Sequence, residues 1–195
     1  MTLFLLLLGA YLIGAIPTGI ILTKLAGGED LRKVGSGNIG ATNVYRSAGR
    51  KLGIITLIGD CLKGVIPLLV AINLFNYQGA SLALVALAAF LGHCYPVYLG
   101  FKGGKGVATA LGVFLVLSPK SILCALALFA LILWRKRYIS LASILTAAAV
   151  PLFVLLFERS LPLVAVTLLI AAIVIWRHRA NIDRLLSGTE NKFKL

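Results

Sequence analysis

The sequence predicts an all-α membrane protein: a polytopic helical bundle of seven transmembrane helices, with the N-terminus outside and the C-terminus in the cytoplasm. The first observation is composition, because 60% of the 195 residues are hydrophobic, 13% are charged, and the mean hydropathy is +1.01. A soluble domain of this size leaves roughly a third of its unfolded surface in water, and these charges are too few to cover it. The second observation is that the polar residues fall in short stretches between apolar runs. We expect a single membrane domain over residues 1–195.

Seven apolar segments are the predicted spans, at 3–24, 53–74, 81–98, 107–117, 121–134, 140–157 and 162–176. The first has no basic residue before Lys24, so it lacks the positive start of a signal peptide and is expected to remain as a helix. The region 107–134 is divided because Pro119 interrupts helical hydrogen bonding. Residues 107–117 alone would reach only about 16 Å, so they need neighbouring helices or a thinned bilayer.

The distribution of positive charge predicts the orientation. Of 19 Lys and Arg residues, Lys63 lies within a span and only Lys120 and Arg159 lie outside, which leaves 16 on the cytoplasmic side. A single span over 107–134 would move half of those 16 across the membrane. The positive-inside rule therefore favours seven spans.

The net charge of +13 would suggest a nucleic-acid partner in a soluble protein. Here the basic residues flank apolar runs, so they indicate membrane orientation and anionic substrates instead, and no nucleic-acid partner is expected. Cys61, Cys94 and Cys124 lie in apolar surroundings without a CxxC pair, so we expect neither a disulfide nor a metal site. No cofactor is expected.

The first polar segment, "VGSGNIGATNVYR", combines turn-forming glycines with hydrogen-bond donors. Its glycines allow tight turns and expose backbone N–H groups. Arg46 offers a planar fork suited to a phosphate. The other donors are Ser36, Asn38 and Asn43. An interfacial loop that only needs turns is the alternative.

The second polar segment, "GFKGGKGVATALG", leads into a helix expected to begin at Val107. Gly103 and Gly104 leave the backbone open, and the N-terminus of the helix presents N–H groups and a positive dipole end. Lys105 adds a full charge. The spacing is not that of a Walker A loop, and no strand precedes it. Lysines acting only as topology signals would leave the glycines unexplained, so an anion site is favoured.

The third polar segment, "HRANID", contains His178 and Asp183. Their H-x4-D spacing is also used by a soluble-facing class of glycerolipid acyltransferases. Five residues on a helix place two side chains about 140° apart, so we interpret the spacing as coincidence. Elsewhere, His93 is interpreted as a helix-end histidine with local hydrogen bonds. Asp60 and Lys63, three residues apart, are expected to form a structural pair within the second span.

Together, "GSGNIGATNVYR", "GHCYPVYLGFKGGKGVATALG" and "HRANIDRLLSGTENK" resemble the three cytoplasmic motifs of the bacterial acyl-phosphate:glycerol-3-phosphate acyltransferases, the PlsY family. The resemblance implies a seven-helix enzyme of the inner membrane with its active site on the cytoplasmic face. Such an enzyme transfers a fatty acyl group from acyl phosphate to the sn-1 hydroxyl of glycerol 3-phosphate and forms lysophosphatidic acid. The chain departs from the family at Ala180, where glutamate is usual.

By motif position, the resemblance implies a set of site residues without a metal. The catalytic residues are Lys105, His178 and Ser36; the substrate-binding residues are Asn38, Arg46, Gly103, Gly104, Ser143 and Asn181.

The acyl phosphate is already activated, so positioning and charge neutralisation could supply much of the acceleration without an enzyme nucleophile. In this mechanism Lys105 stabilises the leaving phosphate and Arg46 holds glycerol 3-phosphate. His178 orients that substrate or takes its proton, and a substrate phosphate oxygen is the alternative base. Two other functions stay open: a transporter or binder of a phosphorylated metabolite, and an acyl-CoA-dependent H-x4-D acyltransferase. The sequence leaves acyl-chain preference and oligomeric state undetermined.

Overall fold

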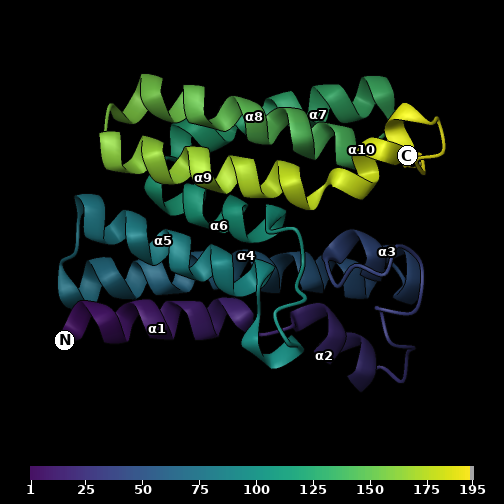
Figure 1. Cartoon of the computed structure of the whole chain (residues 1–195), viewed down its shortest axis with the longest axis horizontal. Coiled ribbons are helices and arrows are strands. Elements are labelled where there is room, and N and C mark those ends of the chain that lie inside the picture. Colours follow the sequence, from purple (N-terminus) through teal and green to yellow (C-terminus); the bar gives the residue numbers. More distant parts are fainter. Residues whose placement is uncertain (194–195) are drawn as a thin grey trace. The chain divides into compact units, whose positions relative to one another are not determined.

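The computed structural model describes residues 1–193, so Lys194, one of the cations predicted to lie inside, is outside the described residues. Over that range every regular element is helical: ten α-helices and one short 3-10 helix (Figure 1). Contacts between Cα atoms divide the chain into an N-terminal unit, Met1–Val116, and a C-terminal unit, Leu117–Leu195. The single domain over 1–195 stays a prediction.

The N-terminal unit is built around two long helices, α4 and α5. Helix α1 packs against both α4 and α5, while α2 and α3 pack against α4 (Figure 1). The elements in order are α1 (Thr2–Ala15), α2 (Thr18–Leu25), α3 (Ala41–Ala48), α4 (Arg50–Phe75), α5 (Gly79–Cys94), the 3-10 helix η1 (Val97–Leu99) and α6 (Val107–Leu117).

The first predicted span, 3–24, is two helices instead of one. Helices α1 and α2 are bent by 42° at the break between them. Pro17 lies in this break, has no N–H to donate, and disfavours helical backbone at the residue before it. Ile16 accordingly adopts φ −58° and ψ 119°, which is not helical. The apolar run is continuous across the break, so hydrophobicity alone does not reveal it.

Glycines bring helix backbones into direct contact within the N-terminal unit. A Cβ atom built on Gly14 would overlap the carbonyl of Ala89 on α5, and one on Gly112 would overlap the carbonyl of Cys61 on α4. Small residues allow such close approach, which is typical of helix packing in membranes, where association depends on van der Waals contact. These contacts fix α1 on α5 and α6 on α4.

The C-terminal unit is an antiparallel arrangement of long helices followed by a short one. Helix α8 packs against α7 and α9, and α10 packs against α8 and α9 (Figure 1). The elements are α7 (Pro119–Lys136), α8 (Ile139–Glu158), α9 (Leu161–Arg177) and α10 (Arg179–Leu186). Helix α7 begins at Pro119, where a missing N–H is tolerated in the first turn. The predicted division of 107–134 at this proline is therefore confirmed.

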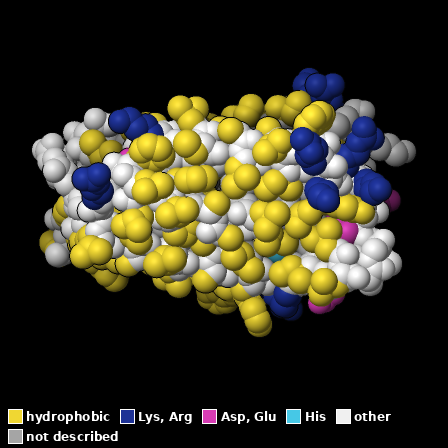
Figure 2. All heavy atoms as spheres, turned by 90° about the horizontal axis from the view of Figure 1, so that it is seen from above, with side chains coloured by type: hydrophobic (Ala, Val, Ile, Leu, Met, Phe, Trp, Pro, Cys, Tyr) yellow, Lys and Arg dark blue, Asp and Glu magenta, His cyan; other side chains and the backbone are white. Residues whose placement is uncertain are grey.

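Three helical segments within residues 1–193 are long and apolar enough to cross a membrane: Arg50–Phe75, Gly79–Leu99 and Ile139–Glu158. The number rises to five if α1 with α2 and α9 with α10 each count as one bent span. Figure 2 shows one face of the molecule, with hydrophobic side chains over most of it and Lys and Arg near its ends. Helix α6 is apolar but short, so the count of seven spans stays a prediction.

Candidate active site

Asn43 organises the first polar segment. Its side chain is 2% exposed at the start of α3. The amide oxygen accepts a hydrogen bond from the Ser36 N–H at 2.8 Å, and the amide nitrogen donates to the carbonyls of Leu31 and Val34, each at 3.1 Å. One buried side chain thus fixes three points of the loop that precedes α3.

The predicted residues Ser36, Asn38 and Arg46 lie on this organised segment. Gly35 and Gly37, on either side of Ser36, have φ values of +59° and +69°, the left-handed region that glycine adopts without strain. The Ser36 side chain is exposed, and the Asn38 side chain accepts from the Gly40 N–H at 2.9 Å, just before α3. Arg46 is exposed in the last turn of the same helix. The segment presents a hydroxyl, an amide and a guanidinium.

The glycine-rich loop lies on the end of α5. Gly104 is buried, and its N–H donates to the carbonyl of His93 at 3.1 Å. Side chains at Gly103 or Gly104 would overlap His93, and one at Gly106 would overlap Phe90. Glycine is therefore required here by close contact. Lys105, partly exposed, is separated by Gly106 from the start of α6, whose first-turn N–H groups have no acceptor within the helix.

His93 itself lies in the last turn of α5 as expected, but its ring contacts are not local. Nδ1 is 3.4 Å from Nζ of Lys63 and 3.8 Å from Oδ1 of Asp60, both on α4. The predicted pair of Asp60 and Lys63 is confirmed, with 2.6 Å between Oδ1 and Nζ.

His178 occupies the 55° bend between α9 and α10. Its side chain is 3% exposed, and Nδ1 lies 2.8 Å from the carbonyl oxygen of Val174. A carbonyl only accepts, so Nδ1 carries a proton and Nε2 is the basic nitrogen of the neutral ring. The Asp183 side chain, in contrast, is exposed on α10. This difference supports the interpretation of H-x4-D as coincidence.

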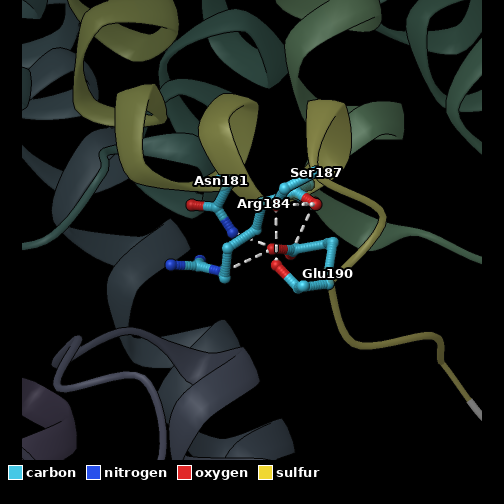
Figure 3. A network of polar contacts seen from close by, with 6 residues as sticks. Asn181, Arg184, Ser187 and Glu190 are labelled. Carbon is cyan, nitrogen blue, oxygen red and sulfur yellow. Dashed lines mark hydrogen bonds and ion pairs between the residues drawn. The ribbon is translucent and has the colours of Figure 1, made fainter.

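Glu190 joins α10 to the first turn of α8 through hydrogen bonds, and Figure 3 shows its contacts with Asn181 and Arg184 of α10. Oε1 accepts hydrogen bonds from Oγ of Ser140 and Nδ2 of Asn181, each at 2.8 Å, and Oε2 accepts from Nε of Arg184 at 2.7 Å. Its carboxylate is 5% exposed. Burial raises the pKa of Glu190, but these three hydrogen bonds and the Arg184 charge outweigh it and hold the pKa below its ordinary value of 4.5. Sequence reasoning missed this role; the available indication was the position of Glu190 at the end of the third motif.

Ser143 lies one turn after Ser140 on α8. It is 5% exposed, and its hydroxyl donates to the carbonyl of Ile139 at 2.9 Å. The C-terminal unit therefore holds Ser143, His178 and Asn181 on buried positions around the start of α8 and the α9–α10 bend. The N-terminal unit holds Ser36, Asn38, Arg46, Gly103, Gly104 and Lys105.

The chemistry of these groups is specific. The loops of the N-terminal unit supply cations, backbone N–H groups and small polar side chains, which suit an anion such as phosphate. The C-terminal unit supplies a histidine with a defined tautomer and a fixed amide, which suit proton transfer and hydrogen bonding to a hydroxyl. Over residues 1–193, no three His, Cys, Asp or Glu side chains gather so that they could hold a metal ion.

Helices apolar enough to cross a membrane are typical of an integral membrane protein, and polar segments with this chemistry suit an enzyme of phosphorylated substrates. A family model described as glycerol-3-phosphate acyltransferase matches residues 4–188. The chain belongs to this family, and it is therefore an enzyme of phospholipid synthesis with a multi-pass membrane fold.

Individual relatives agree along almost the whole chain. The glycerol-3-phosphate acyltransferase of Syntrophotalea carbinolica is 62% identical over 191 residues, covering 98% of this chain and 97% of its own. That of Geobacter sulfurreducens is 62% identical over 185 residues, or 95% of this chain and 94% of its own. The resemblance of the three motifs to this family is thereby confirmed.

Solved structures agree as well. A crystal structure of PlsY (YgiH), an integral membrane glycerol 3-phosphate acyltransferase in its glycerol 3-phosphate form, matches with a TM-score of 0.94 and 45% identity. The lysophosphatidic acid form matches with a TM-score of 0.92 and 43% identity. Both comparisons cover 100% of this chain and 96% of the other.

Proposed function

We propose that the enzyme transfers a fatty acyl group from acyl phosphate to the sn-1 hydroxyl of glycerol 3-phosphate, releasing lysophosphatidic acid and phosphate. The observation that carries this proposal is the glycine-rich loop, whose buried glycines place Lys105 beside the N-terminus of α6. Crystal forms of the related PlsY with glycerol 3-phosphate and with lysophosphatidic acid support the acceptor and the product.

Acyl phosphate is the donor that these segments suit best. Acyl-CoA carries a large nucleotide, whose recognition calls for a soluble domain or an extended basic groove. The connections between helices are short, and the longest ordered one, residues 26–40, is a compact loop held by Asn43. Acyl phosphate needs only a lipid environment for its tail and a small anion site for its headgroup.

The reaction needs no enzyme nucleophile. The sn-1 hydroxyl oxygen attacks the acyl carbonyl carbon, the bond from that carbon to the phosphate oxygen breaks, and phosphate leaves with the electron pair. We assign stabilisation of that charge to Lys105, which follows the two glycines, Gly103 and Gly104, that pack closely on His93. The hydroxyl proton passes to Nε2 of His178 or to a phosphate oxygen.

Substrate binding is assigned to the remaining predicted residues. Arg46 and Asn38 would hold a phosphate group through charge-assisted hydrogen bonds, and the exposed hydroxyl of Ser36, a predicted catalytic residue, lies on the same segment. Asn181, fixed by Glu190, and Ser143 would orient substrate hydroxyl or carbonyl oxygens.

We further propose seven spans, an outside N-terminus and a cytoplasmic active site in the bacterial inner membrane, because this topology places 16 of the 19 Lys and Arg residues inside. Single cysteines introduced at Gly103, Lys136 and Lys192 should react with an impermeant reagent only from the cytoplasmic side. Labelling of the Lys136 position from outside would contradict seven spans, because 107–134 would then cross only once.

The test of the reaction is a direct product assay. Purified enzyme given acyl phosphate and glycerol 3-phosphate should form lysophosphatidic acid and phosphate, with no turnover of acyl-CoA or acyl carrier protein. Lys105→Ala should lower turnover about a hundredfold or more, since charge stabilisation in a shielded site is worth several kcal/mol. Lys120→Ala, on the opposite side of the membrane in this topology, is the matched control and should be near neutral. Robust use of acyl-CoA would overturn the donor, and equal activity of the two variants would remove Lys105 from the site.

A further inference from the structure

An aspartate, a lysine and a histidine are buried next to one another in the N-terminal unit, outside the residues assigned to substrate. Asp60 and Lys63 on α4 are 2% and 5% exposed, and His93 at the end of α5 is 4% exposed. Helix α4 is one of those long and apolar enough to cross a membrane. Ionisable side chains inside such helices are energetically expensive and mark function more often than packing.

Lys63 joins three segments through one ammonium group. Nζ lies 2.6 Å from Oδ1 of Asp60, an ion pair that lacks directed hydrogen-bond geometry at that oxygen. The same Nζ donates to the carbonyl of Ile16 at 2.6 Å, at the break between α1 and α2, and lies 3.4 Å from Nδ1 of His93. The ammonium therefore fixes the α1–α2 break and the end of α5 against α4.

His93 connects these buried side chains to the glycine-rich loop by direct contact. Its carbonyl accepts from the Gly104 N–H at 3.1 Å, and its Nε2 lies where a side chain on Gly104 would be. A side chain on Gly103 would overlap the carbonyl oxygen of His93. The next residue in the chain is Lys105, so an unbroken series of contacts runs from the buried ion pair to the loop cation.

Stability alone is a weak explanation for this cluster. Replacing a buried ion pair by apolar side chains of similar size is often neutral or stabilising, because desolvation opposes the attraction between the charges. A positioning role accounts for the geometry better, because the one ammonium group contacts the Ile16 carbonyl and the His93 ring as well as Asp60, which an apolar side chain could not do.

We propose that Asp60, Lys63 and His93 are positioning residues, which fix the backbone of Gly103 and Gly104 and thereby the place of Lys105 at the start of α6. The inference rests on the role of Lys105 proposed above. None of the three residues touches substrate in this scheme; they act through the loop.

The main test separates positioning from stability. Lys63→Met leaves the Asp60 carboxylate buried without its cation and should lower the thermal unfolding temperature in detergent. The double variant Asp60→Asn, Lys63→Met carries no buried charge there, so it should unfold near the wild-type temperature. Its kcat/KM for acyl phosphate should nevertheless be at least tenfold below wild type. Thr56→Val is the matched control, since Thr56 is also fully buried on α4 and its hydroxyl makes no hydrogen bond in the described residues; its activity should lie within twofold of wild type.

A second measurement follows the loop itself. Amide hydrogen exchange of the peptide covering residues 100–107 should be faster in the double variant than in wild type, and unchanged in Thr56→Val. His93→Asn tests the positioning role independently, because it removes the ring that packs on Gly104 without leaving a buried charge. It too should lower kcat/KM at least tenfold and speed exchange of the same peptide.

The outcomes are distinct. A folded double variant, or a folded His93→Asn protein, with kcat/KM within twofold of wild type would overturn the positioning role, as would unchanged exchange of the loop peptide. Lys105→Ala is measured in parallel. If Lys105→Ala is inactive while these variants are active, only the positioning inference fails; if Lys105→Ala is active, the proposed function of the loop fails instead.

Discussion

Replacement of Asn43 by alanine should slow the enzyme strongly while leaving the helices intact. The side chain makes three hydrogen bonds, to the Ser36 N–H and to the carbonyls of Leu31 and Val34, and it is 2% exposed. A hydrogen bond contributes about 1 kcal/mol net, so the free energy that stabilises the ordered conformation of this loop falls by about 3 kcal/mol. Because each 1.36 kcal/mol is a factor of ten, kcat/KM for glycerol 3-phosphate should fall by up to about 150-fold.

Two further variants sharpen this prediction. Asn43→Asp keeps an acceptor for the Ser36 N–H but turns a second oxygen towards two carbonyls, so it should be at least as impaired as the alanine variant. Asn73→Ala is the control, because Asn73 is exposed and its side chain donates to the carbonyl of Leu69 within its own helix. Steady-state kinetics with varied glycerol 3-phosphate, together with thermal unfolding in detergent, supplies the comparison. An Asn43→Ala enzyme that keeps half or more of the wild-type kcat/KM would refute the reasoning.

Three other predictions concern packing, the third motif and pH. Gly112→Ala should destabilise the protein by about 1–3 kcal/mol in thermal unfolding, because its Cβ would overlap the carbonyl of Cys61, whereas Gly9→Ala, with open space around it, should not. Asp183→Asn should lose less than about threefold in turnover, since an exposed carboxylate does not assist His178 and a surface charge contributes little; an inactive variant would restore the H-x4-D mechanism. Because the pKa of Glu190 is lowered in the folded state, its stabilising contribution is complete above the ordinary value of 4.5 and is lost as the pH falls through the lower folded value. Unfolding temperatures measured from about pH 6 to pH 3.5 should therefore decline more steeply for wild type than for Glu190→Gln, and parallel curves would contradict this.

Local rules account for the parts of the fold that were predictable. Pro119 marked the start of α7, because proline is favoured in the first turn of a helix, although Pro67 and Pro151 lie inside α4 and α8. The same rule applies to Pro17, yet the uninterrupted apolar run around it concealed the break between α1 and α2. The charged pair of Asp60 and Lys63 was predictable because residues three apart on a helix are neighbours.

Contacts between distant residues were not predictable in the same way. Glu190 and Ser140 are 50 residues apart, and Lys63 and His93 are 30 apart. Hydrophobic periodicity and turn composition carry no information on which helices become neighbours, so neither contact follows from them. The sequence therefore identified the motifs, whereas the residues that support them emerged only from the structure.

The last described residues also restrict how this enzyme is best handled. The Phe193 N–H donates to the carbonyl of Arg137 at 2.6 Å, and Nζ of Lys192 lies 5.9 Å from the ring centre of Tyr138. With Glu190 in the same segment, the chain after α10 is fastened to the turn between α7 and α8. Trimming the chain after Leu186 would therefore remove Glu190, which fixes Asn181, together with these contacts to the α7–α8 turn. A label at the fully exposed Met1 disturbs none of them.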